Sequence, residues 1–185
     1  MATERLLEDA IFNGSGTGQP KGIMNSEALI TASRAASGKI TTPDILGMWR
    51  HSHAKYRRNM VWVAHPDCEE QLQQLVMGDK PIWMPEGGLS ESPYQRVLGR
   101  PVIYTDNCAP LGSKGDIQLD DLSKYTLAKK GTARQDWSMH VEFLTDQMAF
   151  RVILRVGGTP DLTQAVKIKN SDTKRSAFIA LGAGA

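Results

Sequence analysis

The chain has 185 residues, a formal net charge of +2, 41% hydrophobic residues and 23% charged residues. This composition is typical of a soluble globular protein and argues against a disordered or fibrous chain. With 22 Lys and Arg against 20 Asp and Glu, it lacks the basic excess of a dedicated nucleic-acid-binding domain. The two cysteines, Cys68 and Cys108, are too few for a disulfide framework, so we expect free thiols in a reducing cytosol where the chain is made. No apolar run approaches the roughly 20 residues that span a bilayer, so we expect no membrane partner.

The first predicted element is a helix over residues 3–12, "TERLLEDAIF". Its apolar residues recur at helical spacing between charged ones. The helix leads into a glycine-rich stretch, "NGSGTGQPKG", over residues 13–22. Gly14 is predicted to be the left-handed residue that ends the helix.

A glycine-rich stretch beside a lysine raises the question of phosphate binding. Phosphate loops normally follow a strand and begin a helix, because the helix N-terminus supplies amide donors to the anion. Here the helix comes first, and Lys21 is followed by glycine instead of Ser or Thr. We therefore predict a structural loop that binds no cofactor, formed by Gly14, Gly16, Gly18, Pro20 and Gly22. A small nucleotide-binding enzyme that uses this loop is the less favoured alternative.

The middle of the chain predicts short helices and strands. Residues 26–36 fit either a strand or a frayed helix. A helix is expected to begin at "TPD", residues 42–44, with Thr42 as its N-cap. We also expect a buried strand at 60–64 and a second helix over 66–78. From Pro81 onward, short extended pieces separated by Gly and Pro indicate a mixed sheet.

A long β-hairpin over residues 137–156 is the clearest prediction. Alternation along its second strand places one set of side chains on a face that we expect to be buried: Met148, Phe150, Val152 and Leu154. Arg151 and Arg155 fall on the opposite face, and Thr145-Asp146 forms the turn. After the hairpin, "AVKIK" at 165–169 predicts one more strand, and residues 173–185 are expected to be a tail.

Candidate catalytic and metal-binding residues are sparse. His51 and His53 lie two apart with no third ligand nearby in sequence, so we expect no metal site. Asp116, Asp120 and Asp121 could pair for acid–base chemistry, but the Asp120-Asp121 pair is also typical of a turn or helix cap. No serine lies in a Gly-x-Ser-x-Gly elbow. We therefore expect no catalytic residue.

Several stretches in collinear order cover nearly the whole chain and resemble the major capsid proteins of tailed phages of the Hong Kong 97 type. They are "LLEDAIFNGSGTGQPKGIM", "YRRNMVWVAHPDCEEQLQQL", "PIWMP", "LGRPVIYTDNCAP", "GDIQLDDLSKYTLAKKG" and "FLTDQMAFRVILRVGGTPDLTQAVKIKN". Two positions depart from the family pattern. Leu119-Asp120-Asp121 replaces a usual Gly-Asp-Phe, and Ser15 stands where acidic residues are common. Both positions are expected to lie in turns, which tolerate Asp and Ser.

The resemblance implies an α+β capsid fold, with a mixed-sheet axial lobe, flanking helices and a peripheral lobe that carries the long hairpin. It assigns the chain as follows: 1–37, remnant of the spine helix and glycine loop; 38–131, axial lobe; 132–160, peripheral hairpin; 161–172, return strand; 173–185, C-terminal tail. It also implies that the family's N-terminal arm, extended loop and most of the spine helix are missing from this sequence.

The function implied by the resemblance is architectural. The chain is expected to associate with itself in hexamers and pentamers and to form an icosahedral shell of a phage or prophage around double-stranded DNA, without sequence-specific contacts. The expected location is the virion, after assembly in the host cytoplasm; the candidate partners are scaffold or protease, portal and decoration proteins. Arg151 and Arg155 are candidate contacts to acidic groups on neighbouring subunits. An encapsulin-like cellular compartment shell is the alternative.

Overall fold

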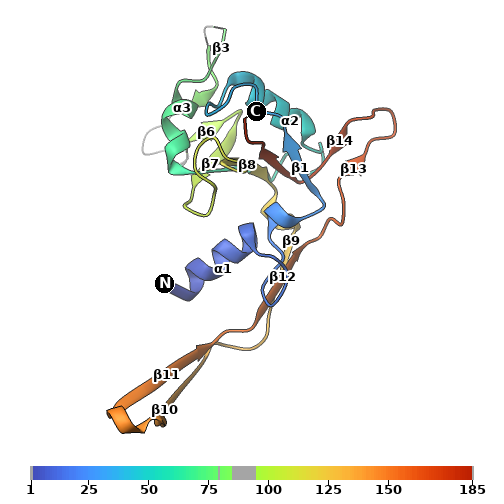
Figure 1. Ribbon diagram of the computed structural model, residues 1–185. Helices are drawn as coiled ribbons and strands as arrows, with labels where there is room; N and C mark the ends of the chain where they lie inside the picture. Colours follow the sequence, from blue (N-terminus) through green and yellow to red (C-terminus); the bar gives the residue numbers. More distant parts are fainter. Residues whose placement is uncertain (1, 79, 85–94, 185) are drawn as a thin grey trace, which may run out of the picture.

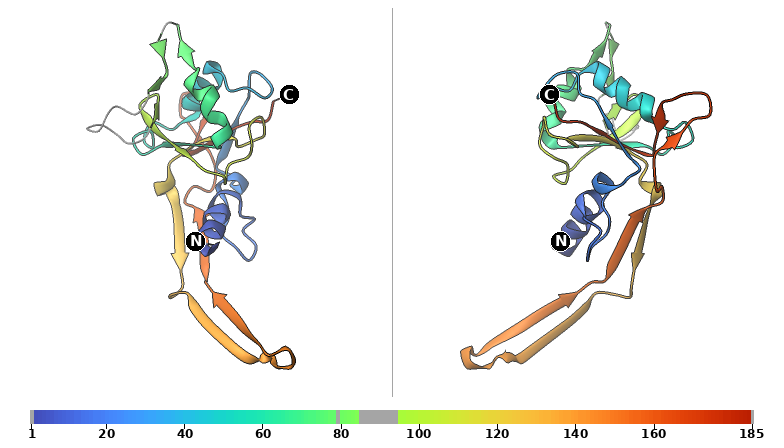
Figure 2. Two further views of the ribbon diagram at one scale, coloured as in Figure 1. Left: turned by 90° about the vertical axis from the view of Figure 1, so that its left-hand side faces the viewer. Right: turned by 45° about the vertical axis from the view of Figure 1, so that its right-hand side comes forward.

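The computed structural model describes residues 2–78, 80–84 and 95–184, and Figure 1 shows two distinct parts. One is a compact sheet lobe that contains α2 and α3. The other is a long, narrow hairpin that extends away from the lobe, with α1 beside it. Figure 2 shows that the hairpin curves along its length.

The sheet lobe is built on a seven-stranded mixed sheet with the order β1-β15-β8-β2-β7-β6-β5. β1 pairs in parallel with β15 and β2 in parallel with β7, whereas β8 pairs antiparallel with both β15 and β2. This confirms the predicted mixed sheet. The strand bounds are β1 Leu29–Ala32, β2 Val61–Ala64, β5 Trp83–Met84, β6 Arg96–Val97, β7 Arg100–Tyr104, β8 Ile117–Asp120 and β15 Phe178–Leu181. Pro85, the last residue of "PIWMP", lies outside the described residues.

Two helices pack on this sheet and contribute to the main core. They are α2, Thr42–His51, and α3, Glu69–Gln73. Their apolar side chains pack with buried sheet residues that include Trp62, Leu119 and Ile179. The indole N–H of Trp62 donates to the carbonyl of Val97 at 3.0 Å, which satisfies its one polar group inside the core.

Both helices begin near the predicted positions but differ in detail. The N-cap of α2 is Thr41, not Thr42, because the Asp44 carboxylate accepts a hydrogen bond from the Thr41 backbone N–H at 2.8 Å. The second predicted helix divides into a 3-10 turn, η2 Pro66–Cys68, and the short α3. Residues after Gln74 leave the helix and form β3, Val76–Met77, which pairs with β4, Lys80–Pro81.

The predicted C-terminal tail is wrong. Residues 173–185 contain β15, which lies inside the sheet between β1 and β8 with all four residues buried. Residues 165–169 yield only the two-residue β13, Val166–Lys167, which pairs with β14, Lys174–Arg175, outside the main sheet. The physical reason is that "AFIAL" is a continuous apolar run, typical of a strand covered on both faces. The strand that returns to the lobe is therefore β15.

Two of the predicted lobe boundaries also shift. The segment 26–36, whose sequence fits either a strand or a frayed helix, contains β1, so the sheet begins before residue 38. The segment 125–129, assigned above to the axial lobe, is β9, Tyr125–Lys129, which pairs with β12, Val156–Pro160. We call the β9–β12 ladder the stem. It carries β10, Arg134–Glu142, and β11, Gln147–Ile153, which we call the distal hairpin.

The stem and the distal hairpin form one long structure with a bend between them at residues 130–133 and 154–155 (Figure 2). The far end is closed by η4, Phe143–Thr145, and by Asp146, whose φ of 52° is left-handed. This confirms a long hairpin with its turn at Thr145-Asp146. It is longer than predicted, because the stem continues it toward the sheet lobe.

The N-terminal helix α1, Ala2–Asn13, lies under the sheet near the stem (Figure 1). It continues through the glycine loop into η1, Ile23–Asn25. Ile11 and Phe12 of α1 pack on a second buried cluster that contains Ile23 and Phe178. A further 3-10 turn, η3 Leu122–Lys124, leads from β8 into the stem. No helix in the described part of the chain is long and apolar enough to span a membrane.

Candidate assembly interface

The glycine loop owes its composition to two different requirements. Gly16 and Gly18 have φ values of 82° and 69°, in the left-handed region that favours glycine. Gly14 does not, so its predicted left-handed conformation is wrong. A Cβ on Gly14 would lie 2.2 Å from the carbonyl oxygen of Pro20, and one on Gly22 would lie 2.4 Å from the nitrogen of Gly14. These two glycines allow the backbone to approach itself closely.

Hydrogen bonds close the loop on itself. The Gly22 N–H donates to the Gly14 carbonyl at 2.7 Å, and the Gly16 N–H donates to the carbonyl of the buried Pro20 at 3.3 Å. The side-chain amide of Asn25 donates to the carbonyls of both Asn13 and Gly14, at 2.8 and 3.0 Å. The end of α1 is thereby fixed to η1, which belongs to the buried cluster under the sheet.

Lys21 joins this loop to the stem through its backbone. Its N–H donates to the Gly158 carbonyl at 2.8 Å, and its own carbonyl accepts from the Tyr125 hydroxyl at 3.0 Å. The ammonium group lies 3.5 Å from the Glu27 carboxylate. All three polar groups of Lys21 are therefore occupied by the protein, and the residue holds α1, the sheet lobe and the stem together.

The distal hairpin has two chemically different faces. Trp137 lies opposite Phe150 in the ladder, and residues directly opposite share a face. We call this the apolar hairpin face and define it by Trp137, Met148, Phe150 and Val152, whose exposed fractions are 70%, 62%, 63% and 41%. The prediction that this face is buried is therefore wrong for Met148, Phe150 and Val152 in the single chain, whereas Leu154, just beyond β11, is half-buried. The alternating pattern does produce an apolar face, but no element of the described chain packs against it.

The opposite face is charged. Asp136 lies opposite Arg151 and accepts hydrogen bonds from Arg151 at 3.0 Å and from Arg134 at 2.9 Å. These two guanidinium groups lower the pKa of Asp136, the bond from Arg151 contributing most. Arg151 thus has a carboxylate partner within its own chain.

Arg155 lies at the bend, and the structure gives it no ion pair within the described residues.

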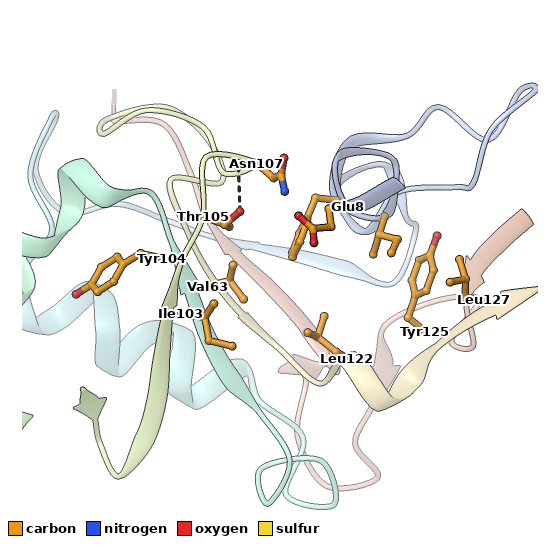
Figure 3. Close-up of a pocket in the computed structure, with 11 residues that line it drawn as sticks. Glu8, Val63, Ile103, Tyr104, Thr105, Asn107, Leu122, Tyr125 and Leu127 are labelled. Atoms are coloured by element: carbon orange, nitrogen blue, oxygen red, sulfur yellow. Dashed lines mark hydrogen bonds between the residues drawn. The ribbon is translucent and has the colours of Figure 1, made fainter. Parts of the chain in front are cut away.

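A groove of about 510 Å³ runs between α1, the underside of the sheet and the stem. Figure 3 shows the apolar side chains that gather there, with Tyr125 and Leu127 contributed by the stem. Ile103, Leu122 and Leu127 in its wall are each about two-fifths exposed (40%, 39% and 44%). Within the described residues, the groove and the apolar hairpin face are two places where large apolar side chains gather at the surface.

The three aspartates considered for acid–base chemistry lie in three separate environments. Asp116 is fully buried and accepts a hydrogen bond from the equally buried Arg34 guanidinium. Asp121 caps η3 by accepting from the Ser123 N–H at 3.1 Å. Asp120 is buried in β8, and burial raises its pKa well above the ordinary range of an aspartate. Arg34, which fixes Asp116, had no signal in the sequence.

The histidines and cysteines also have structural environments. His51 Nδ1 lies 3.2 Å from the Lys174 carbonyl, and His53 Nδ1 accepts from the Lys55 N–H at 3.2 Å. Cys68 and Cys108 are buried free thiols, and burial raises the pKa of each to about 12. Among the residues that the structure describes, no group of three or more His, Cys, Asp or Glu could hold a metal ion.

Comparison with known proteins identifies the family. The model of the Phage capsid family matches residues 1–170. No curated protein matches the sequence. Among solved structures, the fold is similar to "Capsid of empty GTA particle computed with C5 symmetry" and "Capsid of native GTA particle computed with C5 symmetry", each with a TM-score of 0.73 at 17% identity. All of this chain is covered in both, but only 63% and 62% of those chains, so it spans less than two thirds of their length.

These findings confirm both the resemblance and the capsid fold expected from it. The family match extends over nearly the whole chain, which therefore belongs to the Phage capsid family.

Proposed function

We propose that this chain is the shell-forming part of a phage-like major capsid protein and that it self-assembles into an icosahedral shell around double-stranded DNA. The observation that carries the proposal is the apolar hairpin face. A single chain exposes Trp137, Met148 and Phe150 in a row, each more than 60% exposed. Contiguous exposed apolar patches mark interaction sites, because their burial stabilises an assembly by about 25 cal/mol per Å².

The position of this face favours contact between copies. The distal hairpin projects away from the sheet lobe (Figure 1), so its apolar side chains lie beyond the chain's own core. In a closed shell the same contact recurs in every subunit, so individually modest interfaces suffice. Within this proposal the sheet lobe is the axial lobe, gathered in hexamers and pentamers, and the hairpin is the peripheral lobe.

The glycine loop has a mechanical role in this proposal. Gly14, Gly16, Gly18, Pro20 and Gly22 shape a turn whose backbone joins α1 to the stem through Lys21. The angle between sheet lobe and hairpin is thereby held by hydrogen bonds. No nucleotide, metal or catalytic residue is needed for this role.

The remaining parts of the proposal concern the surroundings of the shell. DNA is enclosed without sequence-specific contacts, in keeping with the net charge of +2. Scaffold or protease, portal and decoration proteins are the proposed partners, and the virion is the proposed location after assembly in the host cytoplasm. A cellular compartment shell would use the same contacts but would enclose protein cargo.

A double substitution on the apolar hairpin face, compared with a control variant, tests the proposal. Light scattering and negative-stain microscopy of the purified chain should show self-association that rises with concentration and is lost in Trp137→Ser/Phe150→Ser. Leu46→Ser, which changes an apolar side chain of α2 that is 39% exposed, is the matched control and should associate as the parent does. Nuclease-protected DNA in particles from expressing cells supports a phage-like shell. A parent chain that stays monomeric, or a hairpin variant that assembles normally, contradicts the proposal.

A further inference from the structure

Charge is distributed unevenly along the long hairpin. Residues 125–136 and 151–160 contain five cations, Lys129, Lys130, Arg134, Arg151 and Arg155, and one carboxylate, Asp136. Their net charge is +4, although the whole chain carries only +2. The stem and bend are therefore the basic part of a nearly neutral protein.

The bend shapes part of this charge into a hollow. Lys130, Thr132, Arg134, Ile153 and Arg155 line a space of about 240 Å³. The hydrogen bond from the Lys130 N–H to the Arg155 carbonyl, 3.0 Å long, holds the two strands together there. Arg134 shares Asp136 with Arg151, but within the described residues neither Lys130 nor Arg155 forms an ion pair. We call this the basic hollow.

The far end of the same hairpin is acidic. Glu142 and Asp146 flank η4, both are exposed, and no cation of the described residues pairs with either. The Thr145 hydroxyl lies 3.1 Å from the Glu142 backbone carbonyl and 3.3 Å from the Glu142 carboxylate, so its one hydrogen is shared between them. Between Glu142 and Asp146, Leu144 is 98% exposed. We call Glu142, Leu144 and Asp146 the acidic tip.

The two ends cannot meet within one chain. β10 has nine residues, and at about 3.4 Å per residue a strand of that length extends roughly 30 Å. The acidic tip and the basic hollow lie at opposite ends of this ladder, so any contact between them joins two copies. Such a contact joins two different surfaces, so it forms either a reciprocal two-fold pair or a head-to-tail series that closes into a ring or extends as a filament.

We propose that the acidic tip of one copy docks in the basic hollow of a second copy. The inference rests on the proposed shell function and names a contact between its hairpins. Glu142 and Asp146 supply the carboxylates that Lys130 and Arg155 lack, and charge-assisted pairs of this kind are stronger than neutral hydrogen bonds. Leu144 brings an apolar group to a hollow whose wall includes Ile153. A nucleic-acid duplex fits less well, because its phosphate backbone brings no apolar group comparable to Leu144 to the wall at Ile153.

Charge exchange between two variants tests this pairing. The tip variant is Glu142→Lys/Asp146→Asn. Asn is chosen at position 146 because, like Asp, it tolerates the left-handed backbone conformation found there. The bend variant is Lys130→Glu/Arg155→Glu. Lys114→Glu/Lys169→Glu makes the same charge change as the bend variant, at exposed positions outside the hairpin, and is its matched control. Circular dichroism establishes that all four proteins are folded.

Sedimentation velocity measures association at about 10 mM and about 150 mM salt, between which the Debye length falls from roughly 30 to 8 Å. The parent and the control should associate, more weakly at the higher salt. Each hairpin variant alone should bind itself at least about tenfold more weakly, a change of about 1.4 kcal/mol. An equimolar mixture of the two variants should regain association, because the unchanged acidic tip of the bend variant meets the unchanged basic hollow of the tip variant. The basic tip of the tip variant can also meet the acidic bend of the bend variant.

The tip-to-hollow contact is overturned by variants that associate as the parent does, by a mixture that regains nothing, or by a parent with no salt-dependent association at protein concentrations up to about 1 mM. A bend variant that associates as the parent does but no longer binds a DNA duplex also overturns the contact. That result would make the basic hollow a nucleic-acid-binding site. The Trp137→Ser/Phe150→Ser variant separates the two proposals. If it alone abolishes association, the shell proposal stands and the tip-to-hollow contact falls.

Discussion

The hydroxyl of Tyr125 donates a hydrogen bond to the backbone carbonyl of Lys21 at 3.0 Å, although 104 residues separate them in the chain. The same lysine donates its N–H to Gly158, which pairs with Leu127 on the neighbouring strand of the stem. The glycine loop is therefore fixed to both strands of the stem. This junction determines how the hairpin leaves the sheet lobe.

Removing the hydroxyl should weaken the junction. We expect Tyr125→Phe to lower the free energy of unfolding by about 1 kcal/mol, the typical net value of one hydrogen bond. Gly158→Ala should cost more, because its Cβ would lie 2.7 Å from the Tyr125 hydroxyl oxygen and would displace the ring. Gly157→Ala is the control, since a Cβ there meets nothing within 4 Å. Urea unfolding measures all three, and equal values for the two alanine variants would count against the junction.

The stability of the protein should depend on the close backbone approach in the glycine loop and not on the Lys21 side chain. Gly14→Ala places a Cβ 2.2 Å from a backbone oxygen and should destabilise the protein by several kcal/mol or prevent folding, because backbone must move. Gly18→Ala meets no atom within 4 Å and should cost only about 1 kcal/mol for its φ of 69°. Lys21→Ala should change little, since the backbone makes the bonds to the stem. Calorimetric titration with ATP should show no heat; binding that Lys21→Ala abolishes would contradict a structural loop.

Asp120 should make stability fall as pH rises. Burial raises its folded pKa above the unfolded value of about 3.9, so its favourable contribution is complete below that value and is lost as pH rises through the folded pKa. Asp120→Asn mimics the neutral acid. We expect the stability of Asp120→Asn relative to the parent to increase with pH, by up to about 1.4 kcal/mol per pH unit between the two pKa values. Urea unfolding at pH 4 to 8 measures it, and a difference independent of pH would show that Asp120 titrates normally.

The sheet core and the hairpin should respond differently to the same kind of truncation. Ile179→Ala in the fully buried β15 should cost about 2–5 kcal/mol. Phe150→Ala, at a side chain that is 63% exposed, should change the stability of the monomer by no more than about 0.5 kcal/mol. Thermal unfolding of dilute protein compares them. A large loss for Phe150→Ala would mean that the apolar hairpin face is packed within a single chain.

The elements that were predictable depend on local pattern. Apolar spacing indicated α1, Pro43 marked the first turn of α2, and period-two alternation indicated the distal hairpin. Each of these signals lies within about a dozen residues, the range over which periodicity is informative.

The parts that were not predictable depend on contacts between distant segments. β15 is stabilised by β1 and β8, which lie about 150 and 60 residues earlier in the chain, so its short apolar run resembled a tail. Arg34 is buried only because Asp116, 82 residues away, accepts its hydrogen bond. Alternation along β11 revealed two faces, but it could not reveal whether anything covers them. Alternation also placed Arg151 on the face opposite the apolar one, but it could not reveal that Arg151 pairs with Asp136 of its own chain.

Burial of the apolar hairpin face on assembly can be measured residue by residue with oxidative footprinting. Trp137 and Met148, 70% and 62% exposed in the single chain, should be oxidised readily in dilute protein and strongly protected in assembled particles. Met77, 54% exposed at the opposite end of the sheet lobe, reports on protection elsewhere in the same sample. Protection of Trp137 and Met148 is the result we predict. Equal oxidation of both residues in particles and in dilute protein would contradict a shell built through this face.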